Sequence, residues 1–119
     1  MANPNIVTVA TIQGKTDTQV NVGSGSGSAS TLVTCASNNI IKVNTVMASN
    51  KTGGNVKISL RYDNGAYIAY EISIPIGSSI ALIGKDTPIY VEETDTLTAY
   101  SDTPSAVDIV TSYEIISNS

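Results

Sequence analysis

Apolar and polar residues alternate along several short stretches of the chain, and clusters of Gly, Asn, Asp and Pro separate these stretches. Residues 55–62 and 66–74 show the alternation clearly, and residues 106–116 repeat it. Because successive side chains of a strand point to opposite faces of a sheet, this period of two predicts half-buried β-strands. The predicted strands are residues 6–12, 31–35, 40–49, 55–62, 66–74, 80–83, 89–91, 96–101 and 106–116.

The residue composition supports this prediction. Ile, Val and Thr account for 40 of the 119 residues, whereas Leu, Met, Glu, Gln, Lys and Arg together account for 18. β-Branched side chains fit pleated surfaces, and the second group favours helices. Short strands at close spacing are typical of sandwiches and barrels. We therefore predict an all-β fold, an antiparallel β-sandwich of the jelly-roll or Ig-like kind, with about seven to nine strands.

Residues 40–49 carry apolar side chains on both faces of their predicted strand. Ile41 and Val43 lie on one face, and Ile40 and Val46 lie on the other. A strand that is apolar on both faces is covered on both. We expect this strand to be central in its sheet, or to have one face covered by another subunit.

The turn at residues 63–65 sets the register of the hairpin around it. A two-residue loop would place Leu60 opposite Ala69 and would put the apolar sets of the two strands on opposite faces. A three-residue loop puts both sets on one face and gives its glycine the left-handed position of a bulge-type turn. We predict the three-residue loop, with Tyr67 on the face opposite the apolar set. The predicted pairs are Tyr62 with Ala66, Leu60 with Ile68, and Ile58 with Tyr70.

The N-terminal part of the chain has a different composition from the rest. Residues 14–30 are polar, and residues 23–28 repeat Gly-Ser three times. This composition is typical of a flexible linker. We predict an extended N-terminal arm over residues 1–28 and a β-sandwich domain over residues 29–119. Such an arm can be disordered alone and ordered on a partner.

The net charge of the chain and its distribution limit the classes of partner that the protein can bind. The formal net charge is −4, and the six basic residues are scattered singly. Nucleic-acid binders usually carry a basic stripe that contacts phosphates, so we expect no nucleic-acid partner. No apolar stretch approaches the ~20 residues that span a bilayer, and no signal peptide is evident, so we expect no membrane partner. Charged residues make up only 13% of the chain, which favours close contact with another protein.

The residue types that are missing limit the chemistry. The chain has no His, Phe or Trp, and Cys35 is its only cysteine. The absence of His excludes Ser-His-Asp and Cys-His catalysis and His-ligated metals. Cys35 lies in an apolar run, so we expect a small buried side chain, and a protein without an intrachain disulfide suits a reducing cytosol. We predict no enzymatic activity, no catalytic residue, no cofactor and no metal site.

Two local motifs have a functional and a structural interpretation. Glu92, Glu93 and Asp95 form the densest acidic group, and calcium prefers several oxygen ligands. The segment lacks the Asp-rich spacing of a calcium loop, so we favour a solvated turn. The sequence Asn50-Lys51-Thr52 matches the N-glycosylation pattern. Without a secretory signal we interpret it as a turn.

Five short runs of the chain, taken together, resemble the sequence motifs of a known group of proteins. They are residues 31–35 (Thr-Leu-Val-Thr-Cys), 42–53, 74–79 (Ile-Pro-Ile-Gly-Ser-Ser), 91–97 (Val-Glu-Glu-Thr-Asp-Thr-Leu) and 112–114. Their order resembles small β-sandwich virion structural proteins of tailed bacteriophages, including those of cyanophages. The resemblance covers about residues 30–116 and rests mainly on the Pro-x-Gly-Ser-Ser turn and the acidic turn before Leu97.

In that group, such domains coat capsids or form parts of fibres and tails. The resemblance therefore implies a capsid decoration or cement protein of the virion, assembled in the host cytoplasm on the major capsid protein or other virion proteins. The alternative is a tail, neck or fibre module, including an adhesin domain that binds a host surface or a glycan. A small acidic domain with a low-charge face is also expected to form a homotrimer or another homo-oligomer.

The candidate interface residues are apolar side chains of the arm and aromatic side chains of the sandwich. Exposed tyrosines are effective interface anchors because they combine a large apolar ring with a polar hydroxyl. The candidates are Ile6, Val7, Val9, Ile12, Tyr67, Tyr90 and Tyr100.

Overall fold

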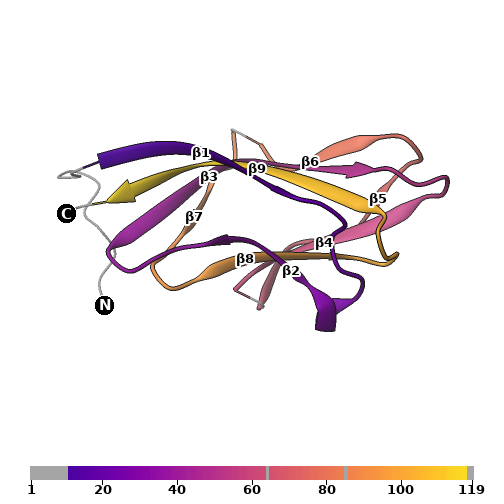
Figure 1. Ribbon diagram of the computed structural model, residues 1–119, viewed down its shortest axis with the longest axis horizontal. Helices are drawn as coiled ribbons and strands as arrows, with labels where there is room; N and C mark the ends of the chain where they lie inside the picture. The colour runs from indigo at the N-terminus through magenta and orange to yellow at the C-terminus, as the bar shows by residue number, and fades with distance from the viewer. Residues whose placement is uncertain (1–10, 64, 85, 118–119) are drawn as a thin grey trace.

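The computed structural model describes residues 11–63, 65–84 and 86–117. Two antiparallel sheets pack face to face along the long axis of the molecule (Figure 1). The strands are β1 (Thr11–Gln19), β2 (Ser30–Thr34), β3 (Asn39–Asn50), β4 (Val56–Tyr62), β5 (Ala66–Ile74), β6 (Ser79–Ile83), β7 (Ile89–Val91), β8 (Thr96–Ser101) and β9 (Val107–Ser117). The predicted all-β sandwich is confirmed. No helix among the described residues is long and apolar enough to cross a membrane.

The first sheet is built around β3. Its strand order is β1-β9-β3-β6, and β7 also pairs with β3. β3 pairs with β9 along its whole length, while β7 pairs with the first part of its other edge and β6 pairs with the last part. The prediction that residues 40–49 form a central strand is therefore confirmed. The predicted placement of Val46 on the face opposite Ile41 and Val43 is wrong, because a bulge between Val43 and Thr45 brings Val46 to the same buried face.

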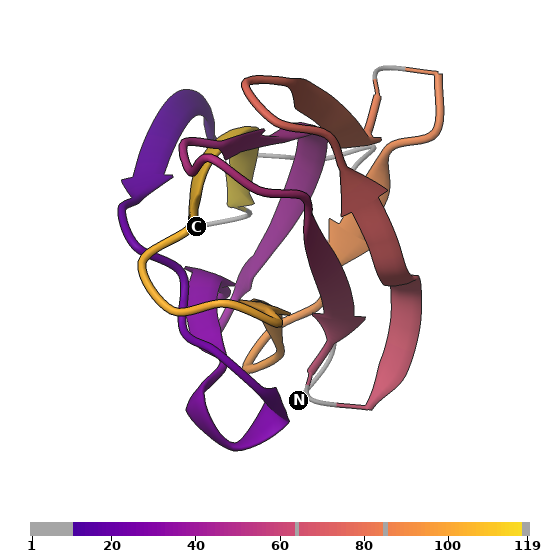
Figure 2. The ribbon, with the colours of Figure 1, turned by 90° about the vertical axis from the view of Figure 1, so that its right-hand side faces the viewer.

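The second sheet has the strand order β2-β8-β4-β5, so β2 and β5 are its edges. Viewed along the molecule, the strands of the two sheets surround a common core (Figure 2). Aliphatic side chains from both inner faces fill this core and leave water together, which is the main source of stability in such a fold. Side chains with no exposed surface include Val43, Val46, Ile58, Leu60, Leu97 and Ile109.

Residues 11–28 belong to the sandwich, which differs from the predicted arm. β1 pairs with β9 over nine consecutive residues, from Thr11 opposite Ser117 to Gln19 opposite Ile109. Val22 follows β1, has no exposed surface and is part of the core. The boundary predicted at residue 28 is therefore wrong for these residues, and residues 1–10 lie outside the described part of the chain.

The Gly-Ser run is bound to β8 rather than extended. The N–H of Ser101 donates to the carbonyl of Gly23 (2.9 Å), and the N–H of Gly25 donates to the carbonyl of Ser101 (2.9 Å). A β-carbon at Gly23 would lie 1.7 Å from the carbonyl oxygen of Ser28. Glycine is therefore required at position 23 by a close approach of two backbone segments, and not by flexibility.

Candidate interaction surface

The β4–β5 hairpin carries the main surface feature, and its turn is the predicted three-residue loop. The observed pairs are Tyr62 with Ala66, Arg61 with Tyr67, Leu60 with Ala69, and Ile58 with Ile72. The first pair is as predicted. The predicted partners of Leu60 and Ile58, which were Ile68 and Tyr70, are wrong.

Two bulges in β5 cause the difference. One extra residue, Ile68, lies between Tyr67 and Ala69, and a second extra residue lies between Ala69 and Ile72. At the second bulge Glu71 has a φ of 49°, in the left-handed region, and its N–H donates to the Ser59 hydroxyl oxygen (2.9 Å). This side-chain contact replaces a ladder hydrogen bond and stabilises an otherwise costly conformation.

Three tyrosines and one arginine gather on the outer face of the second sheet, where the bulges bring Tyr70 beside Tyr67. We call these four residues the tyrosine cluster. Tyr70 lies beside Tyr67, with ring centroids 4.7 Å apart and an interplanar angle of 76°. The rings of Tyr67 and Tyr100 are 6.4 Å apart, and their hydroxyls form a 2.7 Å hydrogen bond. The predicted placement of Tyr67 and Tyr70 on opposite faces is therefore wrong. The fourth member is Arg61, whose Cζ lies 5.3 Å from the centre of the Tyr100 ring.

Contacts within the cluster hold its side chains in place. Edge-to-face ring pairs and a cation over a ring are both attractive arrangements. Arg61 Nη2 also donates to the carbonyl of Ser26 (3.3 Å). The hydrogen bond to Tyr100 raises the pKa of Tyr67. The cluster is ordered yet open to solvent, because Tyr67 is 45% and Tyr70 58% exposed.

More apolar surface lies along the same edge strand. Ile72 in β5 and Ile76 in the turn after it are 41% and 57% exposed. Ile72 lies opposite buried Ile58, but it remains partly exposed because β5 is the edge strand of its sheet. Ile76 sits in the Pro-x-Gly-Ser-Ser turn, where Gly77 has a φ of 69°. An apolar residue between turn-forming residues was the sequence signal for this exposure.

The remaining interface candidates do not join the tyrosine cluster. Tyr90 is 42% exposed, but it lies on β7 in the first sheet, opposite Lys42. Ile12 is 60% exposed on β1. Ile6, Val7 and Val9 lie outside the described residues. Sequence reasoning missed Met47 and Val110, which pair across β3 and β9 and are 38% and 43% exposed on the outer face of the first sheet.

The acidic turn is a structural feature. Glu93 is only 7% exposed, and its carboxylate accepts the N–H of Asn38 (2.6 Å). Asp95 accepts the hydroxyl of Tyr62 (2.8 Å), and burial raises the pKa of Tyr62 to about 12. The interpretation as a solvated turn is thus wrong for Glu93. Within residues 11–63, 65–84 and 86–117 the structure shows neither a pocket nor a group of three or more residues that could hold a metal ion.

Two other residues singled out in the sequence are buried. Cys35 is 1% exposed, as predicted, and burial raises the pKa of its thiol to about 11. Asn50 is 4% exposed, and its Nδ2 donates to the carbonyls of Gly54 (2.8 Å) and Ile74 (3.0 Å). Asn50 therefore organises the turn after β3, in line with the structural interpretation of its motif.

Comparison with known proteins adds no relative: no family model matches the chain, and no curated protein matches it. The functional argument therefore rests on the residues and their geometry.

Proposed function

We propose that this chain is a non-enzymatic structural protein of a phage virion, and specifically a capsid decoration or cement protein that binds the outer surface of the capsid lattice. The resemblance of residues 30–116 to small virion sandwich proteins supports the class. The tyrosine cluster is the observation that supports a binding role, because it places exposed, pre-ordered aromatic side chains on a sheet face.

Such side chains suit an interface because little conformational entropy is lost when they bind a partner. A tyrosine held by ring contacts loses little conformational freedom on binding, and it buries a large apolar area while its hydroxyl stays hydrogen-bonded. Each copy would add a modest binding energy, and repetition over a lattice would multiply it. In this proposal the protein also self-associates, with a homotrimer or another homo-oligomer expected.

Quantitative mass spectrometry of purified particles tests the assignment. A decoration protein is expected at on the order of hundreds of copies per particle, following the capsid symmetry. About a dozen copies or fewer would support the alternative of a tail, neck or fibre module, including a host-surface or glycan-binding adhesin. A protein absent from purified particles would contradict both.

A matched pair of variants tests the surface itself. Particles that lack the protein are incubated with purified chain, and the bound copies are counted after sedimentation. The double substitution Tyr67→Ser and Tyr70→Ser should reduce occupancy at least tenfold, since anchor residues each contribute about 1 kcal/mol or more. Tyr90→Ser is the control, because Tyr90 has similar exposure but lies in the other sheet. Equal losses for both variants would contradict a contact made through the tyrosine cluster.

A further inference from the structure

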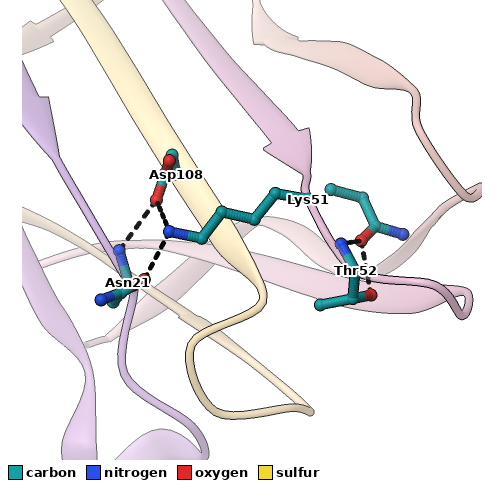
Figure 3. A network of polar contacts seen from close by, with 5 residues as sticks. Asn21, Lys51, Thr52 and Asp108 are labelled. Carbon is teal, nitrogen blue, oxygen red and sulfur yellow. Dashed lines mark hydrogen bonds and ion pairs between the residues drawn. The ribbon is translucent and has the colours of Figure 1, made fainter.

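Asn21, Lys51 and Asp108 meet where three segments of the chain converge (Figure 3). Asn21 follows β1, Lys51 follows β3, and Asp108 lies near the start of β9. Lys51 Nζ is 2.9 Å from Asp108 Oδ1 and 2.5 Å from Asn21 Oδ1. The second distance is below the usual range for an N–H···O hydrogen bond. The Lys51 amine thus contacts both the oxygen of the Asn21 carboxamide and the Asp108 carboxylate.

The backbone on both sides holds these groups together. The N–H of Asn21 donates to Asp108 Oδ1 (2.9 Å), and Asn21 adopts a left-handed φ of 57°. The next residue, Val22, donates its N–H to the carbonyl of Val107 (2.8 Å), and Lys51 donates its N–H to the carbonyl of Ala106 (3.0 Å).

The turn that carries Lys51 is itself ordered. The N–H and the hydroxyl of Thr52 both donate to Asn50 Oδ1, at 2.9 and 2.8 Å, and Thr52 is seen beside Lys51 in Figure 3. Asn50 in turn is anchored by its buried amide group. The amine is therefore presented from a fixed position.

We propose that the protein joins Lys51 and Asn21 by an intramolecular isopeptide bond. The Asp108 carboxylate accepts a proton from the Lys51 ammonium group, and the freed amine attacks Cγ of Asn21. The Nζ–Cγ bond forms, Nζ gives up a second proton, and the Cγ–Nδ2 bond breaks as the departing nitrogen takes up both protons, the first of them returned by Asp108. The lysine ammonium group and the carboxamide become a secondary amide and an ammonium ion, so no oxidant, reductant or cofactor is consumed.

The geometry favours this reaction because it holds the Lys51 amine against the Asn21 carboxamide and the Asp108 carboxylate at once. Two reacting groups held in contact behave as if present at very high concentration, and a positioned carboxylate transfers protons as a general base and then a general acid. Lys51 and Asp108 side chains are 39% and 38% exposed. Partial exposure gives the released ammonia a direct path to solvent.

The bond would act as a clamp on the first sheet. It closes a loop from residue 21 to residue 51 and fixes the end of the edge strand β1 to the turn after β3. A cross-link of this kind removes conformational freedom from the unfolded chain, as a disulfide does. Unlike a disulfide, it persists in a reducing cytosol, and this chain has only one cysteine.

Intact mass spectrometry of the purified full-length chain is the test. We expect a mass lower than that of the linear sequence by one ammonia. Trypsin should then fail to cut after Lys51 and should release residues 16–42 and 43–57 as one branched peptide. The sequence Asn64-Gly65 can also lose ammonia by ring closure, but that loss would appear in the peptide of residues 62–85.

Two variants act as matched controls. Lys51→Arg keeps the positive charge but cannot form the amide, and Asp108→Asn keeps an acceptor for the Asn21 N–H but cannot carry the proton. Both should have the full mass of their linear sequences and give no branched peptide. A wild-type chain of full mass, or an ammonia loss located elsewhere, would overturn the proposal. A cross-linked Asp108→Asn chain would overturn the role of Asp108.

Discussion

Replacing Val22 with alanine tests whether the segment after β1 is part of the folded body. Val22 has no exposed surface, whereas Val20, two residues earlier, is 58% exposed. The substitution removes two buried carbon groups, worth about 1.6 kcal/mol at ~0.8 kcal/mol each. The cavity left behind raises the loss to about 2–3 kcal/mol. With an unfolding entropy of ~2.1 cal/mol/K per residue, this loss should lower Tm by about 10 °C.

Thermal unfolding followed by far-ultraviolet circular dichroism measures the effect, and urea unfolding with an unchanged m-value confirms that only stability has changed. Val20→Ala is the matched control and should change the free energy of unfolding by less than about 0.5 kcal/mol. If Val22→Ala shifts Tm no more than Val20→Ala, the segment does not pack into the core, and the sequence-based prediction of a detached arm was the better one.

Three further predictions concern buried or half-buried groups with polar or ionisable atoms. In an alkaline absorbance titration, Tyr62 and Tyr113 should ionise with a pKa of about 12, so the stability that they confer is complete below pH 10 and is lost as the pH rises to 12; ionisation of both near pH 10 would contradict their burial. In urea unfolding, Glu93→Gln should lower the free energy of unfolding by about 1–2 kcal/mol because a buried charged hydrogen bond is weakened, whereas exposed Glu92→Gln should change it by less than about 0.5 kcal/mol. A thiol reagent at pH 8 should not label Cys35 in the native protein and should label it fully in urea, and rapid native labelling would show that the thiol is accessible.

The parts of the fold that could be predicted are those determined by the local pattern of apolar, polar and turn-forming residues. The apolar pattern of residues 40–49 predicted a central strand, and the strand is central, but its buried side chains lie on one face while Met47 on the other face is 38% exposed. The three-residue turn before Ala66 was also predictable, because turn residues act locally.

The rest depends on partners far away in the sequence. The Gly-Ser run has a linker composition, yet Gly23 and Gly25 pair with Ser101, and nothing near position 23 encodes that contact. The β5 bulges are invisible in the alternation, since an inserted residue leaves both halves of a strand alternating. Their effect is large, because they place Tyr70 beside Tyr67 and thereby create the candidate surface.

The position of β9 has a consequence for how the chain folds during synthesis. β9 lies between β1 and β3, so the first sheet lacks its connecting strand until residue 117 has left the ribosome. Its contacts with β1 join residues as far apart as Thr11 and Ser117. Such non-local pairing slows folding and leaves β1 and β3 with open edges in the nascent chain. A fragment that stops before residue 107 therefore loses the middle of the sheet rather than a border strand, and we expect such fragments to aggregate.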